Sequence, residues 1–455
     1  MIFNVINPAN GDVTTEFETM DSGEIQQRIN AAEIAYQAWQ GTSIAERSEI
    51  MRELARWLEM DKVESAHLMA QEMGKPIREG ILEIEKCAWV CRYYADRAAE
   101  MLDPEPVETD ARNSYVVFKP LGVILGVMPW NYPFWQVFRF AVPSLLSGNT
   151  ILLKHASNVP GCATKIENLF KTAGFPSTVF QNLRIASGEV GPVIENLTIK
   201  GVALTGSKGA GQAVAARAGK LIKPSVLELG GSDPYLILKD ADLELAAKVC
   251  AESRLLNSGQ SCIAAKRFIV AHEIRNEFEE LLVSEMGSAK LGDPLDAETE
   301  VGPLARQDLR DTLHEQVCRS VDLGARVLLG AAVPTGKGFF YPPTVLSDVR
   351  PGMPVFDEET FGPVAAIVPA AGELEAVQLA NQTDFGLGAA VFTEDLKRGE
   401  QIAAYQLEAG NCFVNTFVKS DPRLPFGGIK SSGYGRELSH FGIRSFVNIK
   451  TVYIA

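Results

Sequence analysis

The chain has 455 residues, of which 46% are hydrophobic and 22% are charged, as in a large globular protein with material for two domains. Its 43 Lys and Arg residues against 57 Asp and Glu residues give a formal net charge of −14, which disfavours binding to nucleic acid. No stretch approaches the ~20 uninterrupted apolar residues of a membrane span, and the N-terminus lacks the features of a signal peptide. We therefore expect a cytoplasmic protein that binds neither nucleic acid nor a membrane.

Helix-like and strand-like segments alternate along most of the chain. Residues 22–101 show the 3.6-residue hydrophobic period of helices, and residues 113–128 turn to the β-branched residues of strands. Short apolar runs then alternate with helical stretches, which predicts parallel βαβ units in doubly wound sheets. The expected strands are 150–155, 201–207, 226–231, 235–238, 267–270 and 411–417, and the expected helices are 159–174, 209–221, 242–258 and 272–290.

The alternation restarts after Gly231, which predicts two α/β domains that meet near residues 229–232. The tail 445–454 alternates like an exposed strand, and its partner could be segment 114–119 or the edge of another subunit.

The seven cysteines and five histidines indicate neither a disulfide framework nor a metal site. An odd number of scattered cysteines in a long chain predicts reduced thiols. Cys87 and Cys91 are four residues apart, but no second Cys or His pair follows, so we interpret them as buried packing residues.

Two residues suit nucleophilic and acid–base chemistry. Cys262 lies in a Gly/Ser-rich turn between a helix and a strand, where a side chain is exposed; a small buried core thiol is the alternative. Glu228 lies between leucines at the end of a strand, and burial there would raise its pKa toward that of a general base. An exposed carboxylate at a strand edge is the alternative for Glu228.

Segment 128–149 combines polar residues with an apolar helix. Asn131 and Pro133 suit the start of a helix, and the Asn131 amide could either stabilise an oxyanion or serve as a plain N-cap. Arg139 lies seven residues after Tyr132, on the same helix face, where it could bind a ligand or form an internal ion pair. TGSKGAG at 205–211 is a glycine-rich turn before a helix, a weak signal for phosphate binding.

Together these segments resemble the aldehyde dehydrogenase superfamily over nearly the whole chain. The motifs that carry the resemblance are INPANG near the start, PWNYP at 129–133, LTGS at 204–207, LELGGSDP at 227–234, GQSC at 259–262, EETFGP at 358–363 and PFGGIKSSGYGRE at 425–437. The resemblance implies an α/β fold with two doubly wound parallel-sheet domains and a small β extension for oligomerisation, in a homodimer or homotetramer. We map the dinucleotide-binding domain to 1–106 and 121–229, the catalytic domain to 230–438, and the extension to 107–120 and 439–455.

The resemblance also implies roles for individual residues. Cys262 matches the nucleophile that forms a thioester, Asn131 the oxyanion amide and Glu228 the general base. The positions that it places at the dinucleotide are Trp130, Lys154, Ser157, Thr205, Gly206, Ser207, Leu229, Glu359 and Phe361. The positions that it places at the substrate are Tyr132, Trp135, Arg139, Ser420 and Phe426.

The expected cofactor follows from one departure from the common pattern, and the expected aldehyde follows from Arg139. Many NAD-using members have a glutamate where this chain has Ser157, and a serine tolerates a 2′-phosphate, so we expect NADP with NAD as a poorer substitute. Arg139 points to a substrate that carries a carboxylate, because arginine pairs with carboxylates bidentately. PWNYPFWQVFR with SDPRLPFGG resembles the bacterial succinate-semialdehyde dehydrogenases; glutarate semialdehyde or an aliphatic aldehyde stay open.

Two other functions remain as alternatives at this stage. In a CoA-acylating dehydrogenase, CoA rather than water would take the acyl group, whereas a positioned base such as Glu228 favours water. A non-catalytic protein with the same fold is disfavoured because Cys262, Glu228 and Asn131 occur together.

Overall fold

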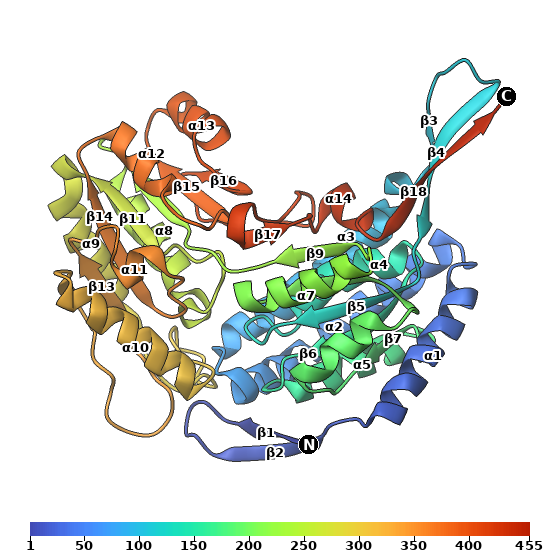
Figure 1. The fold of residues 1–455 in the computed structure, drawn as a ribbon. Helices are drawn as coiled ribbons and strands as arrows, with labels where there is room; N and C mark the ends of the chain where they lie inside the picture. Colours follow the sequence, from blue (N-terminus) through green and yellow to red (C-terminus); the bar gives the residue numbers. More distant parts are fainter.

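Two parallel β-sheets, each covered by helices on both faces, form the body of the protein in the computed structural model, which describes residues 1–455 (Figure 1). The fold is the doubly wound α/β architecture expected from the sequence, which is thereby confirmed. No helix has the length and apolar character that crossing a bilayer requires.

The first sheet has six strands and runs through the part of the chain that precedes residue 229, with one short strand added from near the C-terminus. Its strands, in spatial order, are β17 (Gly433–Tyr434), β9 (Ser225–Glu228), β8 (Ile199–Thr205), β5 (Val123–Met128), β6 (Thr150–His155) and β7 (Phe180–Asn182). All neighbours are parallel except β17 and β9. The helices of this part are α1 (Ser22–Trp39), α2 (Ile44–Met73), α3 (Ile77–Met101), α4 (Trp135–Leu146), α5 (Pro160–Thr172), α6 (Val190–Glu195) and α7 (Lys208–Lys220).

Alternating side chains of β5 divide this part into two cores. Ile124 packs into the cluster of α2, α3, α4 and α5, whereas Val123 and Leu125 pack into the cluster of α1, α6 and α7. A strand that is buried on both faces is apolar at every position, and VILGVM of β5 has that pattern.

The second sheet has seven strands. In spatial order they are β12 (Arg326–Leu329), β13 (Thr344–Ser347), β14 (Val364–Ala370), β11 (Arg267–Ala271), β10 (Pro234–Ile237), β15 (Gly388–Phe392) and β16 (Asn411–Val414). Only β12 and β13 are antiparallel. Its helices are α8 (Leu243–Leu255), α9 (Arg275–Ser288), α10 (Gln307–Asp322), α11 (Pro354–Asp357), α12 (Glu373–Asn381) and α13 (Leu396–Tyr405).

A β ribbon projects from the body and contains the C-terminus (Figure 1). It consists of β18 (Val447–Ile454), β4 (Asn113–Pro120) and β3 (Glu105–Pro106), and α14 (Ser439–Ile443) precedes it. Because β18 pairs antiparallel with the whole of β4, the tail finds its partner in its own chain, as one of the two sequence alternatives predicted. The N-terminal hairpin joins β1 (Ile2–Ile6) to β2 (Val13–Glu18), and short 3-10 helices lie at η1 (Ser187–Glu189), η2 (Leu256–Gly259), η3 (His272–Ile274) and η4 (Lys430–Ser432).

Several element boundaries differ from the sequence prediction. The helix expected over 242–258 ends at Leu255, because Asn257, Ser258 and Gly259 have positive φ angles that a helix cannot contain. The strand expected over 226–231 ends at Glu228, and residues 229–233 lead into the second sheet. Two of the expected domain boundaries separate strands of the same sheet. β3 begins at Glu105, before the expected start of the extension at 107, and β17 of the expected catalytic domain pairs with β9 of the first sheet. The division into domains stays a prediction.

Candidate active site

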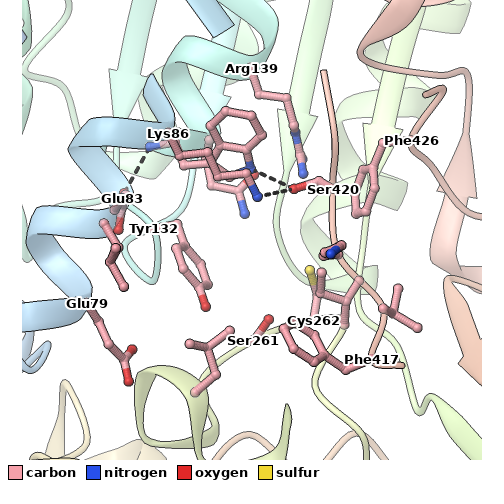
Figure 2. Close-up of a pocket in the computed structure, with 17 residues that line it drawn as sticks. Glu79, Glu83, Lys86, Tyr132, Arg139, Ser261, Cys262, Phe417, Ser420 and Phe426 are labelled. Atoms are coloured by element: carbon pink, nitrogen blue, oxygen red, sulfur yellow. Dashed lines mark hydrogen bonds between the residues drawn. The ribbon is translucent and has the colours of Figure 1, made fainter. Parts of the chain in front are cut away.

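A cavity of about 260 Å³ lies where α3, α4, the loop of Cys262 and the segment 417–420 meet (Figure 2). Of the residues expected at the substrate, Tyr132, Trp135, Arg139, Ser420 and Phe426 all line it together with Cys262. The cavity is smaller than the ~300–1,000 Å³ typical of drug-sized ligands, so it suits a molecule of a few carbon atoms. Glu228 and Asn131 are buried near this centre but do not line the cavity itself.

The loop that carries Cys262 has an unusual backbone. Asn257, Ser258 and Gly259 follow one another at φ angles of 54°, 55° and 75°, in the left-handed region. A Cβ on Gly259 would lie 2.3 Å from the backbone of Gly362, so this position requires glycine. The turn stops α8 and brings Cys262 to the wall of the cavity.

Lys266 forms hydrogen bonds with the backbone of the same loop and was not singled out from the sequence. Its Nζ donates hydrogen bonds to the carbonyl oxygens of Ser261 (3.1 Å), Cys262 (2.8 Å) and Ala264 (3.2 Å). A lysine beside an arginine directly before the apolar strand β11 was the available signal, because charges are rarely buried without partners.

The Cys262 thiol is half-buried, and burial raises its pKa to about 12, although the positive charges of Arg139 and Lys266 oppose that shift. The thiol therefore keeps its proton in this state of the protein. A base must remove that proton before the sulfur can act as a nucleophile.

Asn131 forms hydrogen bonds with the loop that carries Cys262. Its Nδ2 donates to the carbonyl oxygen of Gln260 at 3.1 Å, and Asn257 Nδ2 donates to the Asn131 carbonyl oxygen at 2.7 Å. The prediction that Asn131 and Pro133 begin the helix is wrong, because α4 begins at Trp135. Its first turn is capped from another element: Glu83 of α3 accepts hydrogen bonds from the N–H groups of Phe134 and Trp135, both at 2.9 Å.

Glu228 ends β9 with only 2% of its surface exposed, and neither carboxylate oxygen accepts a hydrogen bond from the protein. Burial raises its pKa well above the ordinary value, while Arg139 opposes this shift and Glu437 adds to it. Gly427 makes room for the carboxylate, because a Cβ there would lie 2.6 Å from Glu228 Oε1. The sequence alternative of an exposed strand-edge glutamate is thus wrong.

Arg139 lines the cavity but has an internal partner. Its guanidinium forms an ion pair with Glu437, donates to Thr205 Oγ1 at 3.3 Å and lies over the Phe426 ring at 4.7 Å. The internal ion pair was one of the two sequence interpretations of Arg139, and the structure contains it.

Lys86 lines the cavity and was not singled out from the sequence either. It lies on α3 beside the buried Cys87, and its Nζ donates to Ser420 Oγ at 2.8 Å (Figure 2). Trp135 Nε1 donates to the same oxygen at 3.1 Å. A lysine next to buried positions of an amphipathic helix was the only sequence signal.

The residues expected at the dinucleotide gather around the carboxyl ends of the first sheet. Ser207 caps α7 by accepting the Ala210 N–H at 3.3 Å, Trp130 packs edge-on against Phe361 at 5.7 Å, and Glu359 accepts the Gly231 N–H at 3.0 Å. Gly206 joins β8 to α7, Leu229 is buried directly after β9, and Thr205 is turned toward Arg139. Lys154 is buried on β6, whereas Ser157 is exposed on the following turn, in a different cavity of about 680 Å³.

Comparison with known proteins agrees with this fold. The description "Aldehyde dehydrogenase family" matches residues 1–452. A probable NADP(+) succinate-semialdehyde dehydrogenase of Synechocystis is 46% identical over 100% of both chains, and a succinate semialdehyde dehydrogenase [NAD(P)+] of Escherichia coli is 46% identical over 98% of this chain and 97% of its own. The crystal structure of succinic semialdehyde dehydrogenase from Streptococcus pyogenes with NADP+ has a TM-score of 0.97 at 38% identity and covers 99% of each chain.

A cysteine on the wall of a small cavity, a buried carboxylate without a hydrogen bond and a doubly wound sheet are features of a nucleotide-dependent oxidoreductase with a covalent step. The chain belongs to the aldehyde dehydrogenase family. The resemblance stated from the sequence motifs is confirmed.

Proposed function

We propose that the protein oxidises succinate semialdehyde to succinate with NADP as the preferred cofactor and NAD as a poorer one. The observation that carries the proposal is the cavity, which joins the Cys262 thiol to a wall of Lys86, Arg139 and Ser420. The names of similar proteins from Synechocystis and Escherichia coli support the same substrate.

Cys262 forms the covalent bond to substrate. Once a base has taken the thiol proton, the sulfur adds to the aldehyde carbon, and the oxygen that becomes negatively charged would accept hydrogen bonds from the Asn131 amide and from the Cys262 backbone N–H. Asn131 Nδ2 carries two hydrogens, of which the contact to Gln260 uses one. Loss of one such oxyanion donor typically costs ~3–4 kcal/mol of transition-state stabilisation.

A nicotinamide bound here would supply the acceptor for the hydride of the former aldehyde carbon, and Cys262 would then carry the acyl group as a thioester. Glu228 then takes a proton from water, whose oxygen adds to the thioester carbon. The carbon–sulfur bond breaks, and the acid leaves as Cys262 is restored. A buried carboxylate without a hydrogen bond and with a raised pKa has the properties of such a base.

The residues present fit a dinucleotide with a 2′-phosphate. Burial alone lowers the pKa of Lys154, so no charge of the protein compensates this amine, and an anionic ligand would. The N-terminus of α7 follows Gly206 and Ser207, where free N–H groups suit a phosphate. At Ser157, a hydroxyl replaces the carboxylate that would repel a 2′-phosphate.

The substrate's own carboxylate would bind at the wall formed by Lys86, Arg139 and Ser420. Arg139 keeps its pairing with Glu437, so its net contribution to an anion is reduced, and Tyr132, Trp135 and Phe426 supply the apolar and aromatic surface for the carbon chain. The β ribbon supports the proposal of a homo-oligomer, because β18 leaves an unpaired edge in this chain. A cytoplasmic location stays a prediction from the sequence.

Steady-state kinetics with a panel of aldehydes and both cofactors tests the proposal. We expect the largest kcat/KM for succinate semialdehyde with NADP, a lower value for glutarate semialdehyde, and a value at least tenfold lower for butanal, which lacks a carboxylate. Formation of succinate rather than a CoA ester should be independent of added CoA. A preference for butanal, or a strict requirement for CoA, would overturn the proposal.

A further inference from the structure

Five charged side chains line the cavity of Cys262, and their partners differ. Glu83 pairs with Lys75 and accepts two backbone N–H groups, and Arg139 pairs with Glu437. Glu79 accepts the Asn257 N–H. The two remaining residues, Lys86 and Lys419, are lysines that form no ion pair, and of these Lys419 is exposed while Lys86 is half-buried. Lys86 is therefore the uncompensated cation that is shielded from solvent in this cavity.

The contacts of Lys86 leave hydrogen-bond donors for a ligand. Lys86 Nζ and Trp135 Nε1 both donate to Ser420 Oγ, at 2.8 Å and 3.1 Å. A hydroxyl oxygen has two lone pairs, so these two donors fill them, and the Ser420 O–H must donate elsewhere. No protein acceptor lies within reach of that O–H, and Ser420 lines the cavity. Lys86 also retains N–H groups that Ser420 does not use.

We propose that Lys86 is the residue that binds the distal carboxylate of the substrate, with the Ser420 hydroxyl as the second donor. The proposal rests on the proposed function, since it assigns the charge that recognises the same aldehyde. Lys86 lies 4.4 Å above the Trp135 ring, which fixes the ammonium in place. Ser420 accepts from Lys86 and donates to the anion, so the two donors converge on one carboxylate.

Glu79 lines another part of the same cavity. Figure 2 shows it well apart from Arg139 and Ser420. A carboxylated aldehyde is thus attracted at the Lys86 wall and repelled at the Glu79 wall, which orients the molecule in the cavity.

The surroundings of Lys86 make this recognition dependent on pH. Burial, and after it the charge of Arg139 on α4, lower the pKa of Lys86 to about 8. Glu83 and Cys87 on α3 and Asp421 after Ser420 oppose this shift. Lys86 is a cation below pH 8 and loses its charge as the pH rises through 8. The KM for a carboxylated aldehyde should therefore rise above pH 8, whereas the KM for butanal should not follow the same curve.

The experiment compares Lys86→Met with Lys397→Met, a matched control in which an exposed lysine of α13 outside the cavity is replaced. For Lys86→Met we expect kcat/KM for succinate semialdehyde to fall about tenfold to a hundredfold, with butanal changed less than threefold. Lys397→Met should change both substrates less than threefold. Lys86→Arg, which keeps a cation, should restore part of the loss.

The outcomes separate the two proposals. If the wild-type protein does not prefer succinate semialdehyde over butanal, the proposed function itself fails. If the wild-type preference is present and Lys86→Met affects both substrates equally, or neither, the assignment of Lys86 is overturned while the function stands. Should Lys86→Met not fold, the pH dependence of KM in the wild-type protein decides: a rise near pH 8 for succinate semialdehyde alone supports Lys86, and parallel curves overturn it.

Discussion

Replacing Glu437 with glutamine removes the carboxylate partner of Arg139 at a buried position, where water cannot solvate the remaining charge. The side chains of Arg139 and Glu437 are only 2% and 6% exposed. Removal of one partner from a buried ion pair typically destabilises a protein by about 3–5 kcal/mol, because the remaining charge stays buried without compensation. In a protein of this size, each kcal/mol lost from the free energy of unfolding lowers the melting midpoint by about 2 °C. We therefore expect the melting midpoint to fall by roughly 6–10 °C.

The same substitution should lower the pKa of Glu228, the proposed general base. The negative charge of Glu437 raises the pKa of Glu228, while Arg139 lowers it. Without Glu437, the Arg139 charge acts alone, so the pKa of Glu228 falls and the carboxylate stays ionised to lower pH. The acid limb of the rate of thioester hydrolysis should therefore move to lower pH.

Thermal unfolding of Glu437→Gln and a pH profile of steady-state turnover measure both effects. Glu195→Gln is the matched control, because Glu195 pairs with Arg217 at the surface, where both side chains are about half exposed. Such a pair contributes only about 0–1 kcal/mol. A Glu437 variant with the stability of the control and the pH profile of the wild type would refute the role that we derive for the buried pair.

Three further substitutions test separate parts of the site. Cys262→Ala should abolish oxidation and leave cofactor binding by fluorescence titration intact; turnover above about a thousandth of the wild-type rate would contradict the nucleophile assignment. Ser157→Glu should move the ratio of kcat/KM values from NADP toward NAD, and a ratio that stays within about twofold would place the choice elsewhere. Gly427→Ala puts a Cβ 2.6 Å from Glu228 Oε1 and should slow thioester hydrolysis while a burst of NADPH persists. Gly219→Ala, which meets open space, is its control.

Short-range patterns predicted much of the fold. β6 covers Thr150–His155, the range expected from TILLKH, and α5 and α7 each lie within two residues of the predicted bounds. These elements have apolar runs of the right period between clear turn residues. The end of α8 was wrong because Asn257 and Ser258 adopt left-handed angles that the tertiary contacts of the nucleophile loop impose.

Sequence motifs singled out Cys262 and Arg139, which line the cavity and whose roles stay predictions. Contacts between segments that are distant in the sequence were missed. The contact of Lys86 with Ser420 joins residues 334 positions apart, and no local pattern encodes it. The same holds for Glu83, which caps α4 from α3 across 51 positions. Charge pairing over such distances depends on the packed fold, so periodicity and composition do not reveal it.

Arg139 and Lys86, the two cations of the cavity that are shielded from solvent, have different tasks because the proposed reaction brings several carboxylates together. Three negative charges would meet in one buried region: the proposed base Glu228, the distal carboxylate of the proposed substrate and the carboxylate of the product. Like charges raise one another's pKa. Arg139 lowers the pKa of Glu228 and is held by Glu437, so it acts mainly on the base. Lys86 has no carboxylate within ion-pair distance and so is available to the substrate. The division keeps Glu228 able to ionise while a second carboxylate is bound in the same cavity.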